Sequence, residues 1–176
     1  MDPRVHHLQG KAERVKPADL LALLRDFYAE KCAQRARHEA NARAVRVYDF
    51  NNTYQYVINR EDAHLSWLRE AIESAGGSLP DAVADVQAPP PAGTDATAET
   101  VRGDAQATQA LVGRWQGRFD AVTNARHRLM LHLILGEMRE HQRFFEQAVA
   151  GRHDLLGRRT SPGETAGRVL ADRWME

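Results

Sequence analysis

One stripe of apolar side chains constrains the fold of this chain more than any other feature of its sequence. From Tyr54 to Ile72 the apolar residues recur at the spacing of a single helix face. Glu61 and His64 fall within this stripe, because residues three positions apart lie on the same side of a helix. An unpaired buried charge is very unfavourable, so an inward-facing acid and imidazole need a partner. The pattern predicts a packed helical interior that holds ionisable groups, and a metal ion is one partner that it could contain.

Other segments of the chain also carry helical periodicity, whereas the alternating pattern of strands is nearly absent. We expect four helices, at about 17 to 47–50, 53–75, 98–123 and 125–150. Asn51-Asn52-Thr53 is the expected turn and N-cap between the first two. Gly76 and Gly151 are expected to end the second and the fourth helix. The predicted fold class is all-α: a four-helix bundle made of two helix hairpins.

A linker of different composition, residues 76–97, separates the two predicted hairpins. It is rich in Pro, Gly and Ala and has no helical period. Extended, such a segment spans roughly 60 Å, whereas a helix of this bundle is roughly 36 Å long. The linker could therefore cross the whole bundle as a long connection between the second and third helices. A flexible tether is the alternative that its composition also allows.

The bundle domain, residues 17–151, lies between a polar N-terminal arm, residues 1–16, and a C-terminal tail, residues 152–176. The tail ends in apolar side chains that we expect to pack on the bundle or on a partner subunit, namely Val169, Leu170, Trp174 and Met175. We expect the protein to be a homodimer.

The composition argues against several classes of function. Lys plus Arg equals Asp plus Glu, 24 of each, so the formal net charge is zero and neither a nucleic-acid nor an anionic-membrane partner is expected. No apolar run reaches the roughly 20 residues of a membrane span, and residues 1–16 lack the apolar core of a secretory signal. The single cysteine, Cys32, allows neither an intrachain disulfide nor a cysteine metal cluster. These features predict a cytoplasmic protein.

A second acid–histidine pair lies late in the chain. Glu137 and His141 are four positions apart, which also places them on one helix face. His64 and His141 are each followed by two bulky residues and then by Ala, so the two halves of the chain are weakly alike. Buried clusters of ionisable groups are frequent at functional sites, and two such pairs strengthen the prediction of a metal centre.

Distances along the helices predict which residues share one level of the bundle. With a first turn near Phe50, Glu39 and Glu61 both lie about 16 Å from it. Glu137 lies about 18 Å from the second turn, so all three approach one middle plane. Glu39 is therefore the expected carboxylate of the first helix. Glu30 is the alternative, and a turn four or five residues away would favour it.

With these residues and the long linker, residues 17–151 resemble the ferritin-like superfamily of rubrerythrins and bacterioferritins. The resemblance implies iron or manganese, held mid-bundle by a Glu from each of two helices and Glu-x-x-His from the other two. Zinc is also compatible with such donors. It further implies redox chemistry with iron and oxygen species, although no particular reaction is encoded. The metal ligands that we predict are Glu39, Glu61, His64, Glu137 and His141.

The motif departs from that of the superfamily in two places. The pair on the fourth helix has a spacing of four rather than three, and the third helix has no Glu at the middle level. Asp104 lies on the apolar stripe of that helix but roughly 12 Å from the middle plane, and we interpret it as an acid near the helix N-terminus.

Two other functions fit the sequence. One is a non-catalytic scaffold or interaction protein with a decayed site, in which arginines such as Arg60 and Arg139 pair with the carboxylates at the bundle surface. The other is a DinB-type bundle with one metal bound by His64, His141 and a further histidine.

Overall fold

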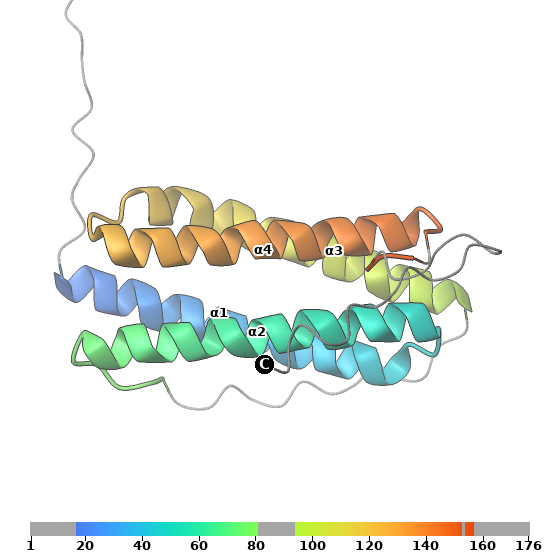
Figure 1. The fold of residues 1–176 in the computed structure, drawn as a ribbon, viewed down its shortest axis with the longest axis horizontal. Coiled ribbons are helices and arrows are strands. Elements are labelled where there is room, and N and C mark those ends of the chain that lie inside the picture. The colour runs from blue at the N-terminus through green and yellow to red at the C-terminus, as the bar shows by residue number, and fades with distance from the viewer. Residues whose placement is uncertain (1–16, 81–93, 153, 157–176) are drawn as a thin grey trace, which may run out of the picture.

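The computed structural model describes residues 17–80, 94–152 and 154–156. These residues form four α-helices and no strand, so the predicted all-helical fold class is confirmed. The helices, coloured along the chain in Figure 1, are α1 (Pro17–Ala44), α2 (Tyr48–Ser74), α3 (Thr94–Asp120) and α4 (Ala125–Val149). None of these helices combines the length and the apolar character that a membrane span requires. The N-terminal arm, residues 81–93 of the linker and the apolar end of the tail lie outside the described residues.

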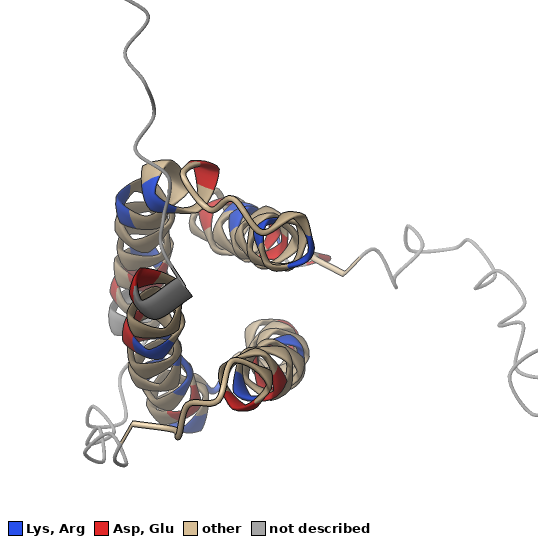
Figure 2. Ribbon diagram, turned by 90° about the vertical axis from the view of Figure 1, so that its left-hand side faces the viewer, with Lys and Arg blue, Asp and Glu red and all other residues tan. Residues whose placement is uncertain are grey.

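The four helices lie side by side as two packed pairs, α1 with α2 and α3 with α4 (Figure 1). Three residues connect α1 to α2, and four connect α3 to α4, so the helices of each pair run in opposite directions. Across the pairs, α2 contacts α4 and α1 contacts α3, although less extensively. Both positively and negatively charged residues occur along the helices (Figure 2). The arrangement is compatible with a four-helix bundle.

The first turn lies earlier than its sequence indicates. The connection is Val45–Val47, and α2 already contains Phe50 and Asn51-Asn52-Thr53. The predicted N-cap there is therefore wrong. Asn51 Nδ2 instead donates to the carbonyl oxygen of Ala42 at 2.7 Å, which satisfies an acceptor in the last turn of α1. An Asn next to a helix end can serve either helix, and here it serves the preceding one.

The remaining helix ends agree better with the sequence. Gly76 and Gly151 follow α2 and α4 with φ of 77° and 85°, a left-handed conformation that glycine adopts without strain. Asn124 caps α4, because its side chain accepts the backbone N–H of His127 at 3.1 Å. Helix α3 begins at Thr94, four residues before its predicted start at 98.

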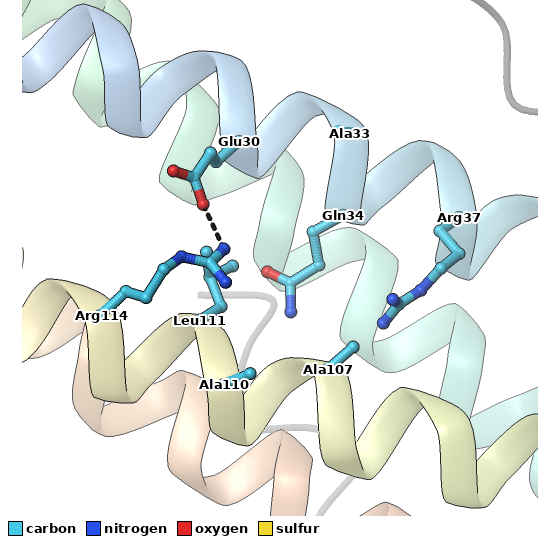
Figure 3. A pocket seen from close by; sticks show the side chains of 8 residues that line it. All are labelled: Glu30, Ala33, Gln34, Arg37, Ala107, Ala110, Leu111 and Arg114. Carbon is cyan, nitrogen blue, oxygen red and sulfur yellow. Dashed lines mark hydrogen bonds and ion pairs between the residues drawn. The ribbon is translucent and has the colours of Figure 1, made fainter.

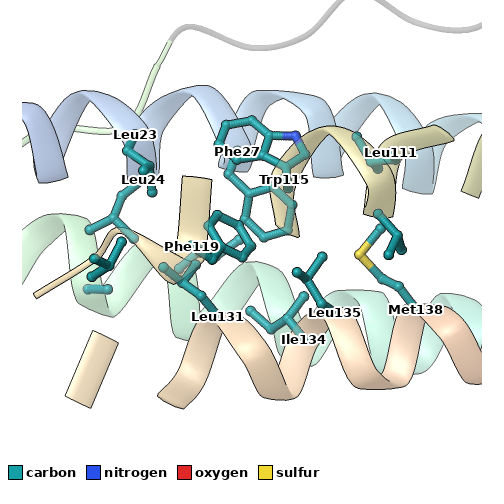
Figure 4. Packing of buried hydrophobic residues seen from close by; sticks show 14 of the residues in the cluster. Leu23, Leu24, Phe27, Leu111, Trp115, Phe119, Leu131, Ile134, Leu135 and Met138 are labelled. Carbon is teal, nitrogen blue, oxygen red and sulfur yellow. The ribbon is translucent and has the colours of Figure 1, made fainter. Parts of the chain in front are cut away.

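Two apolar clusters occupy the two ends of the molecule. In one of them Phe27, Trp115 and Phe119 pack with ring centroids 4.8–5.3 Å apart, against leucines of α1 and α4 (Figure 4). In the other, Tyr54 and Phe145 pack with a centroid distance of 5.1 Å among smaller aliphatic residues. Several buried polar residues lie between the two clusters along the length of the bundle, and they form the candidate site.

Candidate functional site

The interior between the two apolar clusters is a network of buried polar side chains from all four helices. Its members are each less than a tenth exposed: Lys31, Gln34, His38 and Asn41 of α1, Glu61 and His64 of α2, Asp104 and Thr108 of α3, and His141 of α4. The interior of a helical bundle is normally apolar, so each of these buried polar groups needs a specific partner.

Lys31 is the cation at the centre of this network. Its Nζ donates to Glu61 Oε1 at 2.9 Å and to Gln34 Oε1 at 2.8 Å, and the side chains of Lys31 and Glu61 are completely buried. The other carboxylate oxygen of Glu61 lies 3.0 Å from His38 Nδ1. Burial by itself would raise the pKa of Glu61, but His38 and Lys31 outweigh it and hold that pKa below its usual range. Glu61 is therefore an ionised, fully partnered carboxylate.

The position of the first turn explains why Lys31, rather than an acid, faces Glu61. Counted from Arg46 in the middle of the turn, Lys31 and Glu61 are each fifteen residues away, which is about 22 Å along either helix. Glu39 is only seven residues from the turn, or about 10 Å. The expectation that Glu39 shares the level of Glu61 is therefore wrong, because it used a turn four residues too late.

Both candidate acids of the first helix lie at the surface. Glu39 accepts hydrogen bonds from Arg35 at 2.8 Å and Arg43 at 2.5 Å, with 38% of its side chain exposed. Glu30 pairs with Arg114 of α3 at 2.6 Å and is equally exposed. Neither acid contributes to the buried network.

Asp104 forms a second buried centre, which the sequence did not identify. Its Oδ2 accepts hydrogen bonds from Asn41 Nδ2, at 2.8 Å, and from the hydroxyl of Tyr54. Its Oδ1 lies 2.9 Å from Arg37 Nε and 3.9 Å from His38 Nε2. Burial, and then the charge of Asp104, raise the pKa of Tyr54 well above its usual value, so this phenol stays protonated and donates. The interpretation of Asp104 as a helix-end acid is wrong, since it lies ten residues into α3 and only 1% of it is exposed.

The second acid–histidine pair is split between different partners. Glu137 accepts hydrogen bonds from Arg60 at 2.9 and 2.5 Å, and its Oε2 lies 2.8 Å from His64 Nε2. Burial would raise the pKa of Glu137, but Arg60 and His64 lower it overall. The ion pair between Arg60 and a carboxylate, which the sequence offered as an alternative to metal ligation, is present in the structure.

His141 has no comparable partner. It is 1% exposed, and neither of its ring nitrogens makes a hydrogen bond to any described residue. Its ring stacks on that of His64, with centroids 6.1 Å apart and planes 24° apart. Burial lowers the pKa of His141 to about 3, and burial together with the charge of Lys31 lowers that of His64 to about 4. Both imidazoles are therefore neutral at neutral pH, and His64 Nδ1 is also unpartnered among the described residues.

The residues of this network, as arranged, do not fit a metal ion. The described part of the chain holds no group of three or more His, Cys, Asp or Glu side chains placed to coordinate one. Lys31 and His38 occupy both oxygens of Glu61, and Arg60 occupies Glu137. The donors left over are ring nitrogens, which are fewer than the carboxylate-rich set that a bundle metal centre uses.

A surface groove of about 550 Å³ lies between α1 and α3, beside the network (Figure 3). The Glu30–Arg114 ion pair bridges the groove at one end and Arg37 lies at the other, while Gln34 lies between them. Gln34 donates to Thr108 Oγ1 at 3.1 Å and accepts from Lys31, so its amide closes the groove off from the buried lysine. The lining is completed by Ala33, Ala107, Ala110 and Leu111.

The signal that would have identified Lys31 was present in the sequence. A row of buried side chains along α1, continued by Val45 just after its end, recurs at alternating spacings of three and four, and several of them are polar: Leu24, Phe27, Lys31, Gln34, His38, Asn41 and Val45. A purely apolar face drawn through Tyr28 and Cys32 misses this continuation, and both of those residues are only half-buried.

Comparison with models of protein families, with curated proteins and with solved structures finds no match to this chain. The resemblance to the ferritin-like superfamily therefore stays a prediction, and the function is argued from the geometry of the site.

Proposed function

We propose that this chain is a non-catalytic helical bundle that acts by binding another protein chain, with a self-neutralised polar network in place of a metal centre. The observation that carries the proposal is the contact of Lys31 Nζ with Glu61 Oε1 at 2.9 Å, between two fully buried side chains. The lysine supplies the positive charge that a buried carboxylate requires. A cytoplasmic location belongs to the same proposal.

The carboxylates of the network, and that of Glu137 beside it, each have a cationic partner within the chain. These ion pairs join Lys31 to Glu61, Arg37 to Asp104, and Arg60 to Glu137. His64 and His141 are neutral at neutral pH, because burial depresses the pKa of each. A divalent cation placed here would have to displace Lys31, whose own charge would then lack a partner.

The network is also a poor place for chemistry on a substrate. Lys31, Glu61 and His64 are fully buried, and Gln34 separates them from the groove beside α1 and α3. A catalytic group has to reach the bond that it changes. Two large exposed side chains of α4, Leu129 and Leu133, instead support an interaction with another protein.

Metal analysis of protein made in iron-supplemented medium tests the proposal. We expect less than about one metal ion per ten chains, and no shift in melting temperature when iron(II) or manganese(II) is added. Glu61→Ala and His64→Ala should leave the metal content unchanged, and Asp62→Ala is the matched control because Asp62 pairs with Arg35 at the surface. Near-stoichiometric metal that is lost in Glu61→Ala and His64→Ala, but kept in Asp62→Ala, would overturn the proposal.

One observation favours iron or manganese binding, the predicted function, as a second candidate. Both ring nitrogens of His141, His64 Nδ1 and His38 Nε2 are buried without a hydrogen-bond partner among the described residues. Three histidines with spare nitrogens also suit the DinB-type, single-metal alternative, with zinc as a third possible ion. In either case Lys31 would compete with the metal for Glu61, so Lys31→Ala should raise the metal content several-fold. Unchanged metal content in Lys31→Ala would remove this candidate.

A further inference from the structure

The outward face of α4 carries a regular stripe of exposed or partly exposed residues, and its N-terminal end, at Arg126, lies beside residues of α2. The stripe consists of Arg126, Leu129, Leu133, Gly136 and Glu140, and we call it the α4 stripe. Its members alternate at spacings of three and four, which is the seam of a helix that packs against a second helix. Leu129 is 74% exposed and Leu133 is 51% exposed, so this seam is open to solvent in the single chain.

The α4 stripe is complementary to itself when two copies lie antiparallel. A two-fold axis that passes beside Leu133 brings this leucine against its own counterpart in the second copy. The same axis places Leu129 of each copy opposite Gly136 of the other, because the two positions lie on either side of Leu133 at nearly equal spacing. A side chain built on Gly136 would meet nothing within 4 Å, so there is open space above this glycine for a leucine.

The charges of the stripe agree with the same alignment. Arg126 and Glu140 are each seven residues from Leu133, in opposite directions. An antiparallel pair therefore places Arg126 of one copy opposite Glu140 of the other, at both ends of the contact. A parallel pair would instead place like charges together, and opposite charges across a helix pair set its orientation.

We propose that the chain forms an antiparallel homodimer through the α4 stripe. This inference rests on the proposed function, because it names the protein partner that such a bundle binds. A second copy is the occupant that the stripe fits, since an isologous contact requires one surface to carry both halves of every pair. A single pair of helices buries an area near the lower limit for specific complexes, so we expect a dissociation constant in the micromolar range.

Sedimentation velocity of the full chain tests the dimer. The total protein concentration is varied over about 1–200 μM, because this interval spans the expected dissociation constant. We expect the dimer fraction to rise with concentration, and Leu133→Glu to weaken association at least tenfold because it places two carboxylates beside the axis. Tyr48→Glu is the control, since Tyr48 is 72% exposed but belongs to α2 rather than to the stripe. A wild-type chain that stays monomeric throughout, or a dimer that Leu133→Glu leaves intact, would overturn the proposal.

Complementary charge variants test the antiparallel alignment itself. Arg126→Glu alone and Glu140→Lys alone each create two like-charge pairs in their own homodimers, so both should dimerise several-fold more weakly than wild type. A 1:1 mixture of the two variants restores opposite charges at both ends, and it should form a heterodimer of near wild-type affinity. A mixture that associates no better than either variant alone contradicts the alignment.

The outcomes separate this inference from the proposed function. A metal-free monomer would remove the homodimer and leave the non-catalytic bundle to bind a different partner. A dimer with stoichiometric metal would remove the proposed function and leave the α4 stripe as an interface.

Discussion

The two acid–histidine pairs are alike in sequence and different in environment. Glu61 is completely buried and its partners are Lys31 and His38, whereas Glu137 is 18% exposed and is held by Arg60 near the surface. The two histidines differ in their hydrogen bonding: His64 contacts Glu137, whereas His141 has no hydrogen-bond partner among the described residues. The comparison teaches that an acid and an imidazole on one helix face do not define a site. The residue that the neighbouring helix presents at the same level decides what they do.

Removing the buried acid is expected to have the largest effect. Glu61→Leu leaves the ammonium of Lys31 buried without its carboxylate, so the free energy of unfolding should fall by about 3–5 kcal/mol. Urea denaturation measures the loss. The double variant Lys31→Met/Glu61→Leu should recover at least half of it, because the orphaned charge is gone. Asp62→Ala is the control. If Glu61→Leu is no less stable than Asp62→Ala, the assignment of Lys31 as the partner of Glu61 is contradicted.

The two buried histidines predict a loss of stability in mild acid. Their pKa values in the folded state are about 4 for His64 and about 3 for His141, below the value near 6.5 of an exposed histidine. The unfolded chain therefore takes up protons first, and stability falls as the pH drops from about 6.5 towards these folded values. Between pH 6.5 and 4.5 the loss should be on the order of 2–4 kcal/mol, measured by urea denaturation at each pH. In His141→Phe the slope of the free energy of unfolding against pH should fall to roughly half of its wild-type value.

Removing the partly exposed acid should cost less than removing the buried one. Glu137→Gln keeps the shape of the side chain, and Arg60 can turn to solvent because it is 36% exposed. We expect a loss of about 1 kcal/mol, the scale of a half-exposed ion pair. Chemical denaturation of Glu137→Gln and Glu61→Gln under the same conditions gives the ratio of their losses in free energy of unfolding. Equal losses in the two variants would mean that burial does not distinguish the two pairs.

The smallest effect is expected at His141. Replacing it by Phe removes two buried nitrogens that lack hydrogen bonds to described residues and keeps a ring to stack on His64. Stability should change by less than about 1 kcal/mol, and an increase is the expected sign. His64→Phe is the contrasting variant, because it breaks the contact with Glu137 and should destabilise. A large loss in His141→Phe would show that its nitrogens have a partner, such as a metal ion, in the working protein.

The sequence was sufficient for the fold class and for part of the site. Hydrophobic periodicity placed four helices and correctly turned Glu61, His64 and His141 inward. It failed at the first turn, where Val45-Arg46-Val47 has none of the usual turn residues and Asn51-Asn52-Thr53 has several. That error of four residues put Glu39 where Lys31 lies. Asp104 was missed for a related reason, since its partners Asn41 and Tyr54 come from two other helices and only tertiary packing brings them together.

The position of the polar network between two apolar clusters restricts how the helices can slide. Leucines and aromatic rings at either end would accept several alignments of α1 against α2, because apolar contacts are not directional. A slip by one helical turn, about 5.4 Å, would replace Lys31 by Phe27 or Gln34 opposite Glu61. The carboxylate would then lose its ammonium donor in a dry interior. The salt bridge between Lys31 and Glu61 thus disfavours the shifted alignments of α1 against α2 that the two apolar clusters alone would allow.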